Sequence, residues 1–557
     1  MTGLTKKFLI FVLVMGVVAA TGWFGRKAYK RASERRLVIQ AGQYLRTNDF
    51  RNGELCLRRA LQVNPQSLPA TKMVADMLES AGVPSSLGWR VRTAQLQPGN
   101  VSYRLDWAET ALKVKDLKSA EDALGGVTGA AKASAAYNKL AGALAWSKHD
   151  GKDAEQHYME ALRLEPTNLA IVLNLDTIRL GSTNGEAAQA ARISLEHLAT
   201  NETCQLSALH DLQQDAIARK SLSDALKFSK QLAVGPFSRF GDKIDYLQLL
   251  KVSTNADFGP WLASLKEEST NSSARAFAMG RWLAMAEGPT EALSWLQSLS
   301  NEVRTNQPVP LIITDCKIAL KDWTGLLVVV EKQDWAEANF YRLALESLAH
   351  RSLGKEYASQ AAWRNSLRQS AHRLDRLSRL AQVTAGWDWK AENTEVLHEI
   401  ISEFPKEKWA SNSLMAQLYA AGNTRELMEF ITKMHTTDPA DVRVKNNLAN
   451  LYLLRKTDLE KAYRFAREAY ESSPKDPFFT STYAYALLLQ KKPEEALKLF
   501  GNLKPEYLQI PSVAAYYGVV QAESGHGELA KAPLQRAESA KLLPEEKDLV
   551  RLAQARL

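Results

Sequence analysis

The sequence is poor in the residues that disulfide-stabilised proteins and metal proteins need. Only 3 of its 557 residues are cysteines, and no two of them form a CxxC pair. A disulfide framework or a cysteine metal site is therefore not expected. We interpret Cys56, Cys204 and Cys316 each as a small apolar residue buried on a helix. The nine histidines show no metal-ligand spacing, so we also expect no histidine metal site.

Motifs of catalysis and nucleotide binding are missing as well. The chain contains no HExxH, Walker loop, GxSxG or dinucleotide fingerprint. Residues 124–136 are rich in Gly and Ala, but they lack the GK[ST] ending that a phosphate-binding loop requires. We predict that the protein is not an enzyme, with no catalytic residue and no cofactor.

The net charge of +9 might suggest a nucleic-acid-binding protein, but its distribution does not. Residues 1–36 hold eight Lys or Arg and a single Glu, a surplus of seven, so only two of the nine excess charges belong to the rest of the chain. A nearly neutral body has no surplus of cations to bind phosphates. We expect no nucleic-acid partner.

One long apolar run stands at residues 8–24, with no charge in 17 residues and a pair of basic residues on each side. At 1.5 Å per residue it would span about 25 Å, slightly less than a hydrocarbon core of about 30 Å. We predict a transmembrane helix that anchors the protein in a membrane. A cleaved signal peptide ending near Ala20 is the alternative, because small residues stand there.

The charges beside this run bear on the location of the protein. Two Lys precede residues 8–24 and six Lys or Arg follow closely. The positive-inside bias slightly favours a cytoplasmic over a periplasmic body. A short start with two Lys is, however, also typical of anchors whose body is exported. We predict a single-pass protein of a bacterial inner membrane.

The stretch Asn447 to Pro474 contains one complete helix-turn-helix unit. Leu448 and Tyr452 lie on one face of its first helix, four residues apart. Asp458 is suited to cap the second helix through its side-chain oxygen, and the closing proline ends the unit.

The same spacing recurs along the chain. Ala462, Ala496 and Ala530 follow each other at intervals of 34 residues. In several units a small residue of the first helix precedes one of the second by 12 residues, as in Gly142 and Ala154. Small residues allow two helices to approach closely. Near the C-terminus the predicted packing residues are Ala449, Tyr452, Ala462, Ala484, Ala496, Phe500, Gly518 and Ala530.

With this period and these residues the chain resembles the tetratricopeptide repeat (TPR) family, in particular membrane-anchored bacterial members. The match is specific in the units that contain Gly142, Ala154, Tyr158, Ala161 and Pro166, or Ala484, Leu487, Ala496 and Phe500. It is weak in residues 171–202, 241–271 and 308–335, whose repeat type stays open. The resemblance implies an all-α fold, a right-handed α-solenoid of helix-turn-helix repeats.

We divide the chain into four parts. Residues 1–33 form the anchor and a basic juxtamembrane segment, and residues 34–240 form an N-terminal TPR-like solenoid. Residues 241–440 are a degenerate helical middle, and residues 441–557 are C-terminal repeats ending in a capping helix.

In the resembled family the first helices line a concave groove that holds a peptide or helix of a partner protein. Carried over to this sequence, that implies the groove residues Arg443, Asn446, Asn450, Phe478, Ser481 and Tyr485. Two Asn one turn apart offer donor and acceptor to a peptide backbone. We therefore predict an interaction scaffold, with the oligomeric state open. The alternatives are an exported envelope assembly or secretion factor, and a small-molecule sensor or enzyme with a pocket in the degenerate middle.

Overall fold

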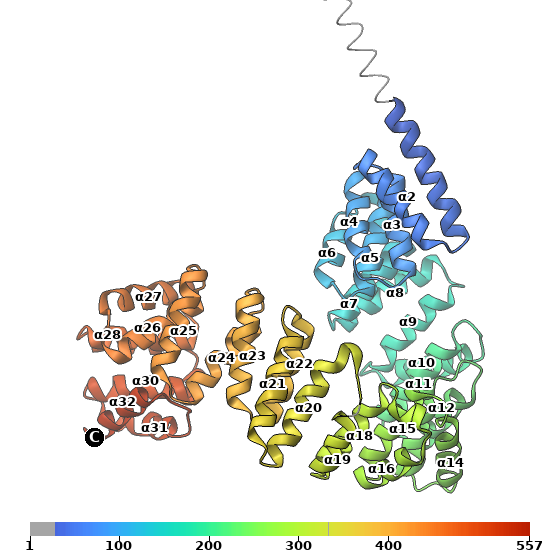
Figure 1. The fold of residues 1–557 in the computed structure, drawn as a ribbon. Coiled ribbons are helices and arrows are strands. Elements are labelled where there is room, and N and C mark those ends of the chain that lie inside the picture. Colours follow the sequence, from blue (N-terminus) through green and yellow to red (C-terminus); the bar gives the residue numbers. More distant parts are fainter. Residues whose placement is uncertain (1–27, 332) are drawn as a thin grey trace, which may run out of the picture. The chain divides into compact units, whose positions relative to one another are not determined.

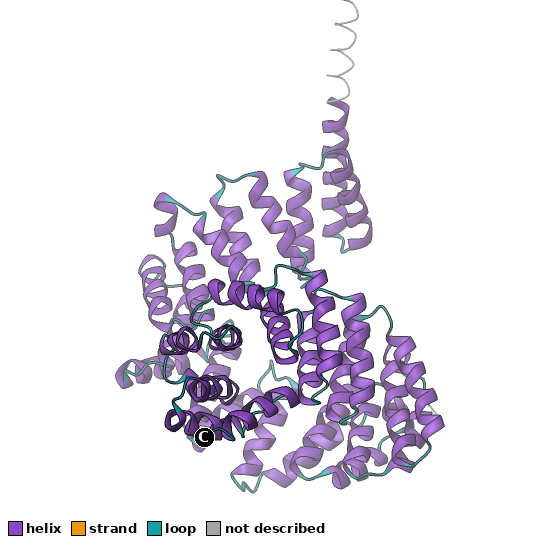
Figure 2. Ribbon diagram, turned by 90° about the vertical axis from the view of Figure 1, so that its left-hand side faces the viewer, coloured by secondary structure: helices purple, strands orange, loops and turns teal. Residues whose placement is uncertain are grey.

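The protein is helical throughout the part that the computed structural model describes, residues 28–331 and 333–557. Helices alternate with short loops, and these residues contain no strand (Figures 1 and 2). The all-α prediction is confirmed. Residues 28–46 are helical and lead into the first of the numbered helices.

Internal contacts divide the chain into two compact units, and the boundary in the sequence lies between Trp282 and Leu283. The helices of the first unit follow each other at short intervals: α2 (Phe50–Val63), α3 (Leu68–Ser80), α4 (Ser86–Leu96), α5 (Val101–Lys113), α6 (Leu117–Gly125), η1 (Gly129–Ala133), α7 (Ala135–Ser147), α8 (Gly151–Leu164), α9 (Leu169–Leu180), α10 (Gly185–Leu198), α11 (Gln205–Ala218), α12 (Leu222–Val234), α13 (Phe240–Val252) and α14 (Phe258–Glu268). Helix α15 (Ser273–Ala286) contains the division.

The second unit continues in the same manner. Its elements are α16 (Pro289–Ser298), α17 (Asn301–Thr305), α18 (Val309–Ala319), α19 (Trp323–Glu331), η2 (Ala336–Ala338), α20 (Asn339–Ser352), α21 (Glu356–Ser370), α22 (Leu374–Gly386), α23 (Lys390–Glu403), α24 (Lys408–Ala420), α25 (Thr424–Thr437), α26 (Val442–Arg455), α27 (Leu459–Ser472), α28 (Pro477–Leu489), α29 (Pro493–Gly501), η3 (Tyr507–Gln509), α30 (Pro511–Glu523), α31 (Gly527–Ala537) and α32 (Pro544–Gln554). The four-part division made from the sequence remains a prediction.

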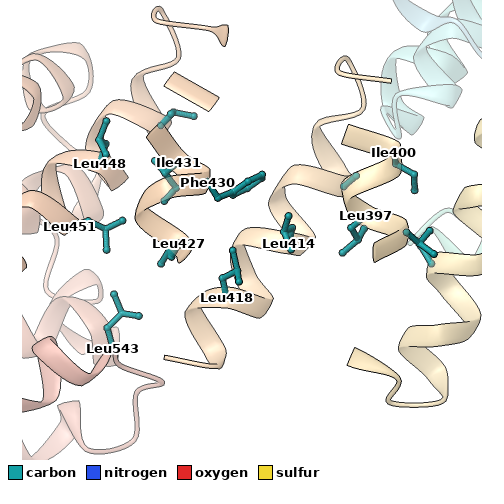
Figure 3. Close-up of a cluster of buried hydrophobic side chains, with 14 of the residues drawn as sticks. Leu397, Ile400, Leu414, Leu418, Leu427, Phe430, Ile431, Leu448, Leu451 and Leu543 are labelled. Carbon is teal, nitrogen blue, oxygen red and sulfur yellow. The ribbon is translucent and has the colours of Figure 1, made fainter. Parts of the chain in front are cut away.

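Most helices pack mainly on their neighbours in the chain, as expected for stacked helix pairs. Apolar side chains between them form continuous clusters. In the second unit one cluster includes Leu397 of α23, Leu414 of α24, Phe430 of α25 and Leu448 of α26 (Figure 3). Leu543, which precedes α32, belongs to the same cluster.

Small residues mark where paired helices come closest. A Cβ atom added to Gly142 of α7 would lie 2.7 Å from Cδ2 of Tyr158 on α8. One added to Gly518 of α30 would lie 2.8 Å from Cγ of Leu534 on α31. In both pairs the neighbour stands 16 residues after the glycine, so the two units share one packing register. Only glycine fits such an approach without a shift of the neighbour.

Helix pairs also occur where the sequence match is weak. Residues 171–202 contain most of the pair α9 and α10, residues 241–271 contain all but the first residue of α13 together with α14, and residues 308–335 contain α18 and α19. Their packing continues the pattern of neighbour on neighbour. The drift of small residues there changed the spacing of the repeat but not its helical character.

One capping prediction was wrong. Asp458 stands before α27, but its side chain accepts no capping hydrogen bond from that helix. Its backbone is left-handed, with φ of 44°, whereas a capping side chain normally projects from extended backbone. Asp458 therefore does not act as the side-chain cap of α27.

The predicted location needs correction. The apolar run at residues 8–24 lies outside the described residues. Among the described residues, no helix is long and apolar enough to cross a membrane. Helix α21, with 15 residues, reaches roughly 22 Å, and the longer helix over residues 28–46 is interrupted by charges. This finding contradicts the predicted single-pass location in a bacterial inner membrane, and that prediction is wrong.

A partly buried ion network joins three helices of the first unit. Glu79 of α3 accepts hydrogen bonds from Arg90 of α4 at 2.5 Å and from Lys113 of α5 at 2.8 Å. Thr110 of α5 donates a third at 3.1 Å. Burial raises the pKa of Glu79, but the hydrogen bonds and charges of Lys113 and Arg90 outweigh it and lower the pKa to about 2. The carboxylate is thus charged wherever the network is intact.

This shift predicts acid sensitivity in α3–α5. The folded pKa of Glu79 lies below the ordinary value of 4.5, so its stabilisation is complete above pH 4.5 and is lost as the pH falls towards 2. We expect up to about 3 kcal/mol of local stability to disappear over that range, as measured by hydrogen exchange. The Glu79→Gln variant should have a lower local stability of α3–α5 at neutral pH, and that stability should change little as the pH falls. Glu109→Gln is the matched control, since Glu109 contacts Lys113 at 3.1 Å from a half-exposed position. Equal acid profiles for the wild type and Glu79→Gln would contradict this prediction.

Candidate functional site

A hollow of about 470 Å³ lies among the first helices of the last repeats, in the second unit. We call it the C-terminal hollow. Its walls come from α24, α26, α28, α30, the segment before α32, and α32 itself. Its lining residues are Tyr419, Asn446, Asn447, Asn450, Phe478, Ser481, Thr482, Pro511, Ser512, Tyr516, Ala540, Lys541 and Glu546.

Glu546 lies at the centre of a hydrogen-bond network in this hollow. The side chain is only 3% exposed, although it belongs to the first turn of α32. Its Oε2 accepts hydrogen bonds from the backbone N–H of Leu543, at 2.9 Å, and from the hydroxyl of Tyr419. Its Oε1 accepts one from the hydroxyl of Tyr516 at 2.6 Å. The start of the last helix is thereby attached to α24 and α30.

The position of α32 follows from local sequence as well as from this network. Pro544 occupies the first turn of the helix, where its missing N–H costs nothing. Glu546 stands three residues after Leu543 and satisfies that residue's free N–H. Beside it, Glu545 accepts a hydrogen bond from Thr424 Oγ1 at 2.6 Å. The turn between α24 and α25 therefore contacts the C-terminal helix directly.

Both tyrosines keep their hydroxyl hydrogen. Burial raises the pKa of Tyr419, and the charge and hydrogen bond of Glu546 raise it further. The pKa of Tyr516 is also raised well above its ordinary value, first by burial and then by the charge and hydrogen bond of Glu546. A neutral phenol beside a carboxylate is a donor, so both side chains serve to hold Glu546.

One asparagine of α26 leaves a buried acceptor unused. Asn446 is 5% exposed, and its Oδ1 is buried without a partner among the described residues. Asn450 Oδ1 lies 2.9 Å from the hydroxyl of Tyr516. The same hydroxyl lies 2.6 Å from Glu546 Oε1, so it is within hydrogen-bond distance of both acceptors. Asn446 Oδ1 is therefore the carboxamide oxygen of the hollow that lacks a donor.

Four of the six predicted groove residues meet in the C-terminal hollow: Asn446, Asn450, Phe478 and Ser481. The other two do not line it. Arg443 is exposed at the start of α26, and Tyr485 is buried with its ring 5.6 Å from that of Tyr516. Burial raises the pKa of Tyr485 to about 12.

The residues predicted to pack the repeats lie inside the helix pairs. Tyr452 is half-buried. The other seven are fully or almost fully buried: Ala449, Ala462, Ala484, Ala496, Phe500, Gly518 and Ala530.

Reasoning from the sequence missed Tyr419, Tyr516 and Glu546. A signal for one of them existed. Asn447, Thr482 and Tyr516 each stand two residues before the small residue of their first helix, and all three line the hollow. Glu546 carried no such signal, because a Glu in the first turn of a final helix is normally a solvated residue that favours the helix dipole.

The hollow offers hydrogen-bonding groups and aromatic surface. Its polar lining is made of amides, hydroxyls, one ammonium and one carboxylate. Within the described residues, no group of three or more His, Cys, Asp or Glu could hold a metal ion. The arrangement is suited to holding a ligand by complementary contacts.

The fold and the packing register together define the class of the described chain: an all-helical protein built of stacked helix pairs. No family model matches the sequence, and no curated protein matches it.

Solved structures with similar stretches include the Cut9–Hcn1 hetero-tetramer of the APC/C, at 13% identity over 82% of this chain and 96% of that chain, with a TM-score of 0.28. The structure of Naa15/Naa10 bound to HypK is 14% identical, over 94% of this chain and 77% of that chain, with a TM-score of 0.27. A TPR protein from Parabacteroides merdae is 16% identical over 44% and 97%, also with a TM-score of 0.27. Similarity this low carries no argument about fold or partners.

Proposed function

We propose that this protein is a protein–protein interaction scaffold, and that its C-terminal hollow holds a segment of a partner protein. The observation that carries the proposal is the gathering of polar and aromatic side chains from successive first helices around one open space. Asn446, Asn450, Phe478 and Ser481 contribute to it.

The volume of the hollow favours an extended segment over a helix. A helix about 10–12 Å wide would fill 470 Å³ with roughly one turn. An extended chain needs less width and exposes its own N–H and C=O groups. Unpaired amides such as Asn446 can satisfy those groups, while the half-exposed ring of Phe478 offers apolar contact.

Selection from a random peptide library displayed on phage, with the full chain as target, tests the proposal. We expect selected peptides to lose at least about tenfold in affinity when Phe478 is replaced by Ala, because buried aromatic contacts commonly dominate peptide binding. Tyr357→Ala is the matched control, since that ring is exposed on α21 and does not line the hollow. Failure to enrich any peptide, or equal binding to both variants, would refute the proposal.

A further inference from the structure

We propose that the C-terminal hollow recognises a cationic group, the guanidinium or ammonium of its ligand. This inference rests on the proposed function and specifies it: the bound segment would carry an arginine or lysine side chain. The reasons are a buried carboxylate without a counter-ion, a buried carboxamide oxygen without a donor, and aromatic rings around the same space.

The buried carboxylate is the first reason. Glu546 accepts three hydrogen bonds, but no Lys, Arg or His of the described residues forms an ion pair with it. A buried charge is costly unless it is paired with an opposite charge. Oε1 has a single donor, Tyr516, so it retains a lone pair that a ligand N–H can use.

The unpaired oxygen of Asn446 points to the same chemistry. Its Oδ1 is buried without a donor among the described residues. A guanidinium has five N–H donors and no acceptor, and an ammonium has three donors, so a basic group matches both this oxygen and the free lone pair of Glu546 Oε1.

Aromatic rings complete the environment. Tyr419, Phe478 and Tyr516 all line the hollow, and a cation is attracted to the face of such rings. Lys541 also lines it and opposes a second cation, but its side chain is exposed, where water and salt weaken the repulsion. The interior charge of Glu546 is screened less.

The test uses the full chain and a fluorescein-labelled peptide, Gly-Ser-Arg-Ser-Gly, in fluorescence anisotropy. The matched probe replaces Arg by citrulline, which keeps the shape and removes the charge. We expect the arginine peptide to bind at least about tenfold more tightly than the citrulline peptide. Equal binding of both, or no binding of either, overturns the inference. Peptides selected by display that bind without any basic residue would overturn it while leaving the scaffold role standing.

Variants locate the effect. Glu546→Gln should reduce the preference for arginine over citrulline to about twofold or less, whereas Glu545→Gln, whose carboxylate bonds Thr424 and does not line the hollow, should leave it unchanged. Lys541→Glu lies at an exposed site and tests the charge without disturbing the buried network. It should tighten binding of the arginine peptide about twofold to fivefold. Unchanged preference in both Glu546→Gln and Lys541→Glu overturns the inference.

Free arginine distinguishes the source of the cation. If it displaces the peptide only at concentrations at least about a hundredfold above the peptide's Kd, the basic group belongs to a polypeptide, in agreement with the scaffold role. If it binds as tightly as the peptide, the cation site stands, but a small amine is its ligand and the scaffold role fails.

Discussion

Replacing Phe500 by Ala is expected to remove about 3–5 kcal/mol from the stability of the C-terminal repeats. The side chain is 1% exposed at the end of α29, and its ring lies 5.1 Å from that of Tyr517 on the next helix. Truncation loses the transfer free energy of the ring and leaves a cavity between two repeats. Stacked repeats depend on their neighbours, so the loss should spread from α29 to α28 and α30.

Hydrogen exchange is the suitable measurement for Phe500→Ala, because a long repeat array need not unfold in one step. The matched control is Phe478→Ala, the same truncation at a ring that is 50% exposed. We expect that control to change stability by less than about 0.5 kcal/mol. Similar losses of protection in the two variants would contradict the packing register described above.

Replacing Glu546 by Ala is expected to cost about 3 kcal/mol and to release α32 from the hollow. The change leaves the hydroxyls of Tyr419 and Tyr516 and the N–H of Leu543 without their shared acceptor. Donors left unpaired in a buried site cost about 1–3 kcal/mol each, and water that enters the open hollow offsets part of the sum. Hydrogen exchange should show lost protection in residues 540–554.

Glu545→Ala is the control for this second prediction. Its carboxylate bonds Thr424 Oγ1 from a half-buried position on the same turn, so its removal should cost less than about 1 kcal/mol. If Glu545→Ala releases α32 as fully as Glu546→Ala does, the network at Glu546 does not hold the helix. Glu546→Gln should lie between the two, because the amide retains one acceptor oxygen.

The helices and their pairing could be predicted because they depend on local patterns. Small residues that recur every 34 positions, such as Ala462 and Ala496, indicate helix pairs of one kind, and the structure buries both between helices. Close approach at Gly142 likewise follows from the 12-residue offset to Ala154.

The candidate site was only partly accessible to the same reasoning. Asn446 and Asn450 were named because groove positions repeat with the helix period, and both line the hollow. Tyr485 was named by the same rule, but it is buried against Tyr516 of the next repeat and does not line the hollow. Which of two adjacent helical positions faces a hollow depends on how far each repeat is rotated against the next. Many side chains at the contact between the repeats set that rotation together.

The sequence alone determined that this protein is a series of helix pairs whose net charge beyond residue 36 is close to zero. Helix period and composition are local properties of the chain, so both can be seen without a structure. Only the tertiary structure decided that Glu546 lies buried between Tyr419 and Tyr516. Those tyrosines stand 127 and 30 residues before Glu546 in the chain. No local pattern reports such a contact, because it exists only once the last helix has packed across three earlier repeats.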